Sequence, residues 1–226
     1  GTVVGTTTPV STATTTISGR LTIAAAHFLD AGSTNWDLAG TGTVFVENGT
    51  FLEDTSTVRY SGNGANVRST PYYNLDINAG AGSPTYTAVG LGIVIGNNLT
   101  IGGTANSTFN VTSSDPALDV NGSVTIRSNG TFVASNSAAF TIAQNFTNDG
   151  TFTGSGGRVT FDSAGAASIA AGNSSFSDVY INKTGTITFT EHATTTGLFQ
   201  IQAASAFTVN SGQQLAVGGT FFNALG

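Results

Sequence analysis

The sequence predicts an all-β fold, a parallel β-solenoid (β-helix) with about 20–25 residues per coil. Three observations predict it. Apolar and polar residues alternate over short runs, turn-forming residues separate these runs, and apolar positions recur at the length of one coil. A sandwich or a barrel explains the first two observations, but only a solenoid explains the third.

The alternating runs are short and rich in β-branched residues. Residues 123–126 (SVTI) and 158–161 (RVTF) are examples, whereas the good helix formers Lys, Glu, Leu and Arg are scarce. Turn clusters such as residues 128–130 (SNG) and 148–150 (NDG) separate the runs. The chain is therefore expected to consist of short strands joined by tight turns.

The repeat at coil length is a pair of apolar residues four positions apart. Three copies follow one another at intervals of about 20–25 residues. This is the length of three short strands with three turns, which is one coil of a β-helix. The pairs are Ile95 and Leu99, Val120 and Val124, and Ile142 and Phe146.

A longer similarity is superimposed on the coil repeat. Residues 49–51 (GTF) match residues 150–152 at an offset of 101, and Val58 matches Val159 at the same offset. Asn129 opens the related stretch NGTF at residues 129–132. We therefore expect coils nested in a super-repeat of roughly 100 residues, stacked about 4.8 Å apart in a rod of roughly 50 Å.

The composition suits such a coil. Valine, isoleucine, leucine and phenylalanine fill inward positions, threonine covers outward ones, and glycine and asparagine are expected at positive-φ corners. Charged residues make up only 8% of the chain, against about 25% in an ordinary soluble domain. Like charges stacked one coil apart repel each other, which explains their scarcity.

Net charge and sulfur content limit the partners. The chain has a net charge of −6 and six scattered basic residues, so no nucleic-acid partner is expected. No apolar segment is long enough for membrane insertion. Cysteine and methionine are both absent, which suits an oxidising, extracellular or cell-surface location.

Two regions are expected. Residues 1–20 are rich in threonine and form either a first coil or an extended segment donated to a neighbouring subunit; residues 21–226 form the solenoid. Neither end shows a capping helix or a charged cap, so copies of the chain are expected to stack head to tail. The predicted assembly interface comprises Val3, Val4, Val217, Phe221, Phe222 and Leu225.

No catalytic, metal or cofactor site is predicted, and the chain is not expected to be an enzyme. His27 and His192 lack partners at metal-ligand spacing, and Glu191 is expected on the opposite face of a strand from His192. The acidic residues are spread thinly, so the carboxylate pair of a glycosidase is not evident. The nearest candidates are Asp115 with Asp119 and Glu53 with Asp54. Asp115 precedes a proline and is interpreted as a turn residue, and Glu53 and Asp54 are interpreted as loop residues.

Two further features bear on carbohydrate. Trp36, Tyr72 and Tyr73 are candidates for a sugar-binding aromatic surface, although packing of Trp36 inside the coil is the favoured interpretation. Nine Asn-x-Ser/Thr sequons are candidate glycosylation sites. They are Asn48, Asn98, Asn106, Asn110, Asn121, Asn129, Asn145, Asn173 and Asn182.

The stretches at residues 129–132, 149–152, 158–162 and 179–182 resemble the β-solenoid repeat regions of bacterial surface proteins, such as autotransporter and filamentous-haemagglutinin-like adhesins. The resemblance implies export, surface display, and adhesion or matrix formation. The leading hypothesis is a structural subunit of an extracellular filament or surface assembly. The alternatives are an adhesin fragment that binds glycan or a host surface and, less favoured, a polysaccharide-active enzyme.

Overall fold

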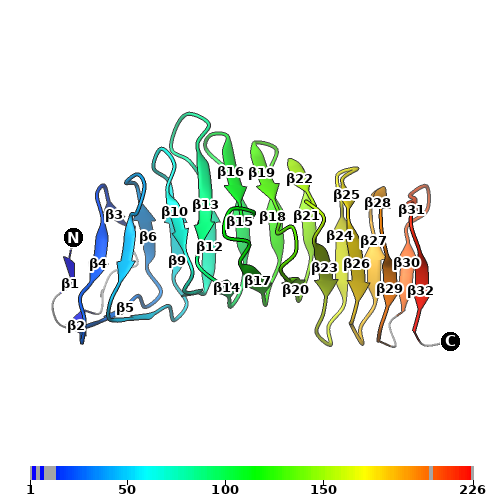
Figure 1. Cartoon of the computed structure of the whole chain (residues 1–226), viewed down its shortest axis with the longest axis horizontal. Coiled ribbons are helices and arrows are strands. Elements are labelled where there is room, and N and C mark those ends of the chain that lie inside the picture. Colours follow the sequence, from blue (N-terminus) through cyan, green and yellow to red (C-terminus); the bar gives the residue numbers. More distant parts are fainter. Residues whose placement is uncertain (1, 4–5, 8–13, 204–205, 225–226) are drawn as a thin grey trace.

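The computed structural model describes residues 2–3, 6–7, 14–203 and 206–224 as a rod of stacked coils. The chain advances from one end of the rod to the other (Figure 1). Every described strand–strand pairing is parallel, and each strand pairs with the third strand before or after it. The rod is therefore a β-solenoid with roughly 22 residues per coil and ten or eleven described strands on each face, as the sequence predicted.

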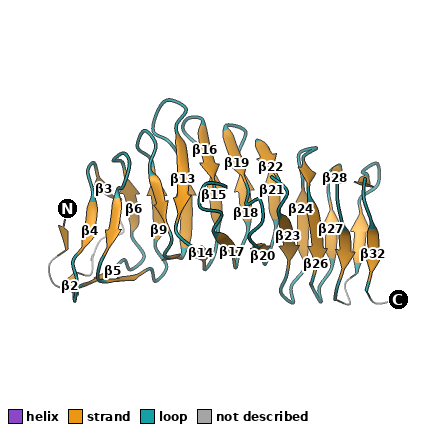
Figure 2. Cartoon of the chain, in the orientation of Figure 1, coloured by secondary structure: helices purple, strands orange, loops and turns teal. Residues whose placement is uncertain are grey.

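Each coil contributes one strand to each of three faces, and loops connect them (Figure 2). Face 1 is formed by sheets of three, five and three strands. Its strands are β1 (Thr2–Val3), β4 (Leu21–Ile23), β7 (Phe45–Glu47), β10 (Asn66–Arg68), β13 (Thr85–Val89), β16 (Ser107–Asn110), β19 (Gly130–Val133), β22 (Thr151–Thr153), β25 (Ser175–Phe176), β28 (Ala193–Thr195) and β31 (Leu215–Val217).

Face 2 is formed by a sheet of three strands followed by a sheet of eight. Its strands are β2 (Thr6–Thr7), β5 (Phe28–Asp30), β8 (Thr50–Leu52), β11 (Pro71–Tyr72), β14 (Gly92–Ile95), β17 (Ala117–Val120), β20 (Phe140–Ile142), β23 (Arg158–Phe161), β26 (Asp178–Ile181), β29 (Phe199–Ile201) and β32 (Phe221–Asn223).

Face 3 is a single sheet of ten strands along the whole rod. Its strands are β3 (Thr15–Ile17), β6 (Asn35–Leu38), β9 (Thr57–Tyr60), β12 (Asn74–Ile77), β15 (Leu99–Ile101), β18 (Val124–Ile126), β21 (Phe146–Asn148), β24 (Ala167–Ala170), β27 (Ile187–Phe189) and β30 (Phe207–Val209).

The coil-length repeat in the sequence is the register of these sheets. Ile95 pairs with Val120 and Val120 with Ile142 on face 2. Leu99, Val124 and Phe146 stack in the same way on face 3. The four-residue spacing within each pair spans one corner, so the repeat predicted which residues lie above one another.

The proposed super-repeat of roughly 100 residues is wrong as a repeat of coils. Val58 lies in β9 on face 3, whereas Val159 lies in β23 on face 2. Phe51 lies on face 2 and its counterpart Phe152 on face 1. The offset is not a whole number of coils, because the coils differ in length and the coil that joins Val58 to Leu75 is a short one. The shared stretches are local turn-to-strand motifs that fit more than one corner.

The core is one continuous apolar column enclosed by the three faces. Aromatic rings form a row on face 1, where Tyr86 pairs with Phe109, Phe109 with Phe132 and Phe132 with Phe152. The rings of Phe109 and Phe132 are stacked, with centroids 5.7 Å apart. Because strands are about 4.8 Å apart, rings on successive strands contact one another directly.

Nine of the described glycines have a positive φ, as expected for corners, but other corner glycines are required for a different reason. Gly62 has an ordinary φ, but an added Cβ would lie 1.8 Å from the carbonyl oxygen of Gly40 in the preceding coil. Here glycine is required because two coils approach closely at the corner. Asn173 is the one asparagine with positive φ in the described part of the chain. Most other corner asparagines serve as hydrogen-bonding groups.

The described residues contain no helix, and hence none that is long and apolar enough to cross a membrane.

Candidate functional site

The last described coil leaves core positions uncovered. Phe221 is in register with Phe199, and their rings are stacked with centroids 5.7 Å apart. Phe199 is fully buried, whereas Phe221 is 54% exposed. The difference arises because a coil covers both sides of Phe199 and only one side of Phe221. Phe221 therefore continues the core row into solvent.

Other inward residues of this coil are in the same position. Phe207, Val209, Leu215 and Val217 are half-buried and pack on the core from one side. Their strands β30 and β31, like β32, each pair with a single neighbour among the described strands. We call the inward residues of β30 to β32 the apolar end face. It combines exposed apolar side chains with three strand edges that have no second neighbour among the described strands.

The opposite end is richer in threonine. The backbones of β1, β2 and β3 pair with β4, β5 and β6 of the same chain, and each has one described neighbour. Thr15 and Ile17, which pair with Trp36 and Leu38, are half-buried. This end therefore also presents three strand edges.

The predicted interface residues occupy different places. Phe221 and Val217 belong to the apolar end face. Phe222 pairs with Gln200 on the outward row of face 2, so it lies on the side of the rod. The backbone of Val3 pairs with Ile23. Val4 and Leu225 lie outside the described residues.

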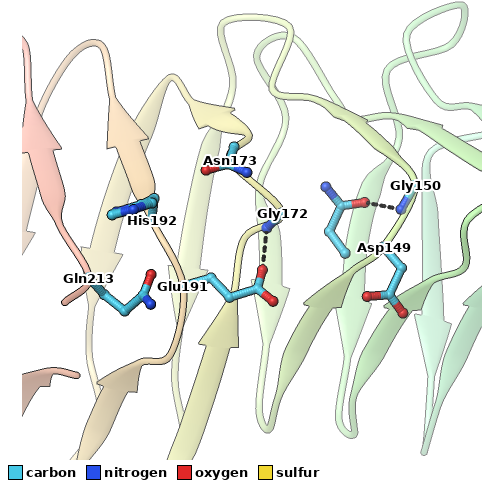
Figure 3. A pocket seen from close by; sticks show the side chains of 8 residues that line it. Asp149, Gly150, Gly172, Asn173, Glu191, His192 and Gln213 are labelled. Carbon is cyan, nitrogen blue, oxygen red and sulfur yellow. Dashed lines mark hydrogen bonds between the residues drawn. The ribbon is translucent and has the colours of Figure 1, made fainter. Parts of the chain in front are cut away.

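A polar hollow of about 320 Å³ lies at the corner between faces 3 and 1 (Figure 3). Glu191 accepts a hydrogen bond from the backbone N–H of Gly172 at 2.8 Å. His192 is exposed, and its Nδ1 accepts one from the N–H of Gln214 at 3.0 Å. The hollow is lined by Asn148, Asp149, Gly150, Gly172, Asn173, Glu191, His192 and Gln213.

These side chains do not form a metal centre. Glu191 and His192 border the same hollow, so their expected separation to opposite faces of a strand is wrong; both lie in a turn. The carboxylates of Asp149 and Glu191 do not converge on a common point (Figure 3). Throughout residues 14–203 and 206–224, no group of three His, Asp or Glu side chains could hold a metal ion.

The corner between faces 2 and 3 carries a row of side-chain-to-backbone hydrogen bonds. The Oδ1 of Asn74 accepts from the N–H of Asn98, and the Oδ1 of Asn98 accepts from the N–H of Ser123. The pattern continues two coils further, where Asn145 accepts from the N–H of Ser168 at 2.9 Å. These amides link neighbouring coils where the backbone leaves the sheet.

The sequons differ in accessibility. Asn129 is half-buried, and its Oδ1 and Nδ2 bond to the N–H and the carbonyl of Gly103, both at 2.8 Å. Asn98 and Asn110 are also half-buried. The exposed sequon asparagines are Asn48, Asn106, Asn121, Asn145, Asn173 and Asn182. Glycosylation remains a prediction, and these six offer the better acceptors.

The acidic residues singled out from the sequence have structural partners. Asp115 lies in a turn with a positive φ of 47°, and its carboxylate accepts hydrogen bonds from the next coil. Burial acts to raise its pKa, but hydrogen bonds from Ser137, Asn136 and Ala138 outweigh this, and the pKa of Asp115 is lowered. Asp119 accepts from the hydroxyl of Thr141 at 2.6 Å.

Glu53 and Asp54 follow β8 at a corner, with Asp54 at a positive φ of 42°. The protonated Asp54 carboxyl donates a hydrogen bond to Asp30, and this bond, the negative charge of Asp30 and that of Glu53 raise the pKa of Asp54. Glu53, Asp54 and Asp115 lie between strands, in agreement with their interpretation as turn or loop residues, whereas Asp119 lies in β17.

The aromatic candidates for sugar binding are mostly inside the coil. Trp36 is buried, and its indole N–H donates to the carbonyl of Ala31 at 3.2 Å. Tyr72 is completely buried, and only Tyr73 of the three is half-exposed. The structure therefore provides no aromatic platform from these residues.

Two buried tyrosines share a hydrogen bond. The hydroxyl of Tyr72 donates to the carbonyl of Arg68 at 2.9 Å, so the hydroxyl of Tyr60, also 2.9 Å away, acts as donor to Tyr72. Burial raises the pKa of Tyr60 to about 12, and burial together with Tyr60 holds the pKa of Tyr72 well above its usual range. The folded chain therefore disfavours tyrosinate at this pair.

We expect alkaline unfolding between pH 10 and about 12. The folded-state pKa is raised, so the stability is complete below pH 10 and is lost as the pH rises through about 12. The rise in the pKa of Tyr60 corresponds to about 2–3 kcal/mol. Far-ultraviolet circular dichroism and tyrosinate absorbance should change together. If both tyrosines ionise near pH 10 with the β spectrum intact, the burial argument is wrong.

Lys183 is an unexpected core residue. It is fully buried, and its Nζ donates to the carbonyls of Ala143 and Asp162 and to the hydroxyl of Ser163, at 2.6–2.7 Å. These acceptors come from the two preceding coils at the corner after face 2. Burial lowers the pKa of the ammonium, and the attraction of Asp162 opposes this shift.

One group of side chains was missed by the sequence interpretation. Asp37, Arg59 and Asp76 are consecutive in register on the outward side of face 3. The interval from Arg59 to Asp76 is shorter than the one from Asp37 to Arg59, and this hides the alignment from a search at constant spacing. A sequence comparison that allows the coil length to vary would align these three charged residues.

No protein-family model matches the chain, and neither the curated proteins nor the solved structures contain a significant match to it. The solenoid fold therefore stands on the structure itself.

Proposed function

We propose that this chain is a structural subunit of an extracellular filament or surface assembly, in which copies stack head to tail. The apolar end face carries the proposal. It exposes Phe221 and leaves Leu215 half-buried beside three strand edges with a single described neighbour each. An exposed strand edge pairs readily with another strand, and apolar side chains beside it favour such pairing. The other end offers three edges of the same type.

The strand count suggests how copies join. Neighbouring strands on one face are three apart in the strand numbering, as β27 and β30 are, and the last described strand is β32. A continuous spiral therefore puts β1 of the next copy above β30, β2 above β31 and β3 above β32. Successive copies then turn by one face, about a third of a rotation, and advance by about 50 Å at 4.8 Å per coil.

The remaining features are consistent with material exposed outside the cell. The absence of cysteine and methionine and the scarcity of charge suit a stable rod under oxidising conditions. The resemblance to adhesin repeat regions implies the same location. The proposed role requires no cofactor and no catalytic residue.

Electron microscopy and sedimentation over a range of concentration and salt test the proposal. We expect filaments with a rise of roughly 50 Å per copy. Phe221→Asp should raise the concentration at which filaments form by about tenfold to a hundredfold, because it places a charge where an apolar side chain would be buried.

The matched control is Leu91→Asp. Leu91 is 93% exposed in a turn on the side of the rod, so this variant should form filaments like the unmodified chain. Circular dichroism would show that both variants remain folded. Monomers alone under all conditions would refute head-to-tail assembly.

The second hypothesis, an adhesin fragment, loses two of its three aromatic candidates because Trp36 and Tyr72 are buried. Polar groups on a sheet face are the other source of glycan contacts. The outward row of face 3 offers such groups.

A further inference from the structure

The outward side of face 3 has an unusual row of charged residues. Asp37 pairs with Arg59, and Arg59 pairs with Asp76. Threonine continues the row on both sides, at Thr16 before it and Thr100 after it. In a chain with only 8% charged residues, three successive charges in one row are conspicuous.

The charges do not neutralise one another by ion pairing. An ion pair of this rod joins Arg68 and Glu47, whereas Asp37, Arg59 and Asp76 form none with one another. Arg59 instead donates from Nε to the carbonyl of Asn78 at 3.1 Å. The Oδ1 atoms of Asp37 and Asp76 are buried and lack a hydrogen-bond partner. A buried acceptor without a partner costs about 1–3 kcal/mol, so folding alone does not explain this row.

Two hollows flank the row. One, of about 210 Å³, is lined by Thr14, Asn35, Trp36, Asp37, Thr57, Arg59 and Asp76. The other, of about 240 Å³, is lined by Thr57, Asn74, Leu75, Asp76, Asn98, Thr100 and Arg127. They share Thr57 and Asp76 and therefore adjoin along the rod axis; we call the pair the groove, which extends from β6 to β15 and ends at Arg127. Its length is about 15–20 Å at 4.8 Å per strand.

The lining has a mixed hydrogen-bonding character. Asp37 and Asp76 offer acceptors, Arg59 and Arg127 offer donors, and asparagine and threonine side chains offer both. The two acidic and two basic groups balance in formal charge. Burial raises the pKa of Asp76, against a hydrogen bond from Asn78 and the positive charges of Arg59 and Arg127. A ligand with many hydroxyls, each both donor and acceptor, matches this lining.

We propose that this groove binds a neutral polysaccharide in an extended conformation, with successive sugar units lying across successive strands. The carboxylates of Asp37 and Asp76, which line the hollows, would accept hydrogen bonds from sugar hydroxyls, and Arg59 would donate to those hydroxyls. Arg59 lies between the two carboxylates, where a glycosidase needs room for the scissile bond, so the groove is suited to binding rather than cleavage. The site lies on the side of the rod and does not depend on end-to-end assembly.

Calorimetry and fluorescence with cellohexaose and mannohexaose test the proposal, with a hexamer of galacturonate as the acidic comparison. Trp36 is the only tryptophan in the chain and lines the groove, so its emission reports on occupancy. We expect saturable binding of at least one neutral hexasaccharide and weaker binding of the acidic one. Asp37→Asn and Asp76→Asn should each lower the affinity at least tenfold, since each replaces an acceptor oxygen by a donor.

Asp119→Asn is the matched control. Asp119 is an aspartate on the outward row of face 2 and should leave the affinity unchanged. Three results would overturn the proposal: no binding of either neutral hexasaccharide, preference for galacturonate, or an equal loss of affinity in the control. Filament formation is measured separately from saccharide binding. A chain that binds no saccharide could therefore still form filaments, and a chain that forms no filaments could still bind saccharide.

Discussion

Replacement of Phe132 by alanine is expected to lower the free energy of unfolding by about 3–5 kcal/mol, the usual range for removing a buried aromatic ring. The ring of Phe132 is fully buried and lies 5.4–5.8 Å, centroid to centroid, from the rings of Phe109, Phe140 and Phe152. Removing it leaves a cavity that the stacked strands on either side cannot close, because their spacing is fixed by backbone hydrogen bonds.

The loss of stability in Phe132→Ala should also be confined to the coils around the substitution. Coils contact only their neighbours, so stability in a solenoid is a sum of nearest-neighbour terms. Hydrogen exchange is expected to accelerate first in β16, β19 and β22, while the ends keep their protection. Urea unfolding gives the total change, measured in a Phe221→Asp background so that filaments do not interfere.

Phe28→Ala is the matched control for this prediction. Phe28 is 37% exposed on β5, so its removal should cost less than about 1 kcal/mol. Two results would contradict a local stabilising role of the stacked aromatic row. One is an equal loss of unfolding free energy in Phe132→Ala and Phe28→Ala, and the other is uniform acceleration of hydrogen exchange along the rod.

The second large effect is expected for Lys183→Met, which should cost about 2–4 kcal/mol. Methionine approximates the length of the lysine chain but removes all three donors. The carbonyls of Ala143 and Asp162 and the hydroxyl of Ser163 then lose a hydrogen bond in a buried corner. The variant should weaken the junction among three successive coils, which urea unfolding and hydrogen exchange in β20 to β26 would detect.

Arg158→Met provides the comparison. Arg158 is exposed, and its guanidinium lies over the ring of Tyr180, 4.5 Å from the ring centroid. Loss of an exposed cation–π contact costs about 0.5–1 kcal/mol, well below the effect at Lys183. If Lys183→Met proves as mild as Arg158→Met, the ammonium is not a structural link between coils.

Much of the fold could be predicted from the sequence because the core repeats locally. An inward residue must be apolar in every coil, so Ile95, Val120 and Ile142 reveal their stacking at nearly constant spacing. Val217 and Phe221 follow the same inward pattern, in register with Thr195 and Phe199 of the preceding coil.

The side-chain rows were harder to predict, since they depend on loop length. The short coil between Val58 and Leu75 brings Asp76 above Arg59, although the neighbouring coils are longer. Lys183 looks like a surface residue by type, yet its corner turns it towards three acceptors. Neither placement follows from residue type or from a fixed period.

The sequence by itself determined the secondary-structure class, the coil length and the inward apolar rows, because alternation and repetition are properties of the chain read in order. The tertiary structure alone decided which face each strand joins, which corner residues approach each other closely, and which polar groups share a row. Those features depend on pairing between residues about one coil apart, and the number of residues in each turn sets that pairing. The predicted all-β solenoid was confirmed, and the groove between Asp37 and Arg127 became visible only once the coils were stacked.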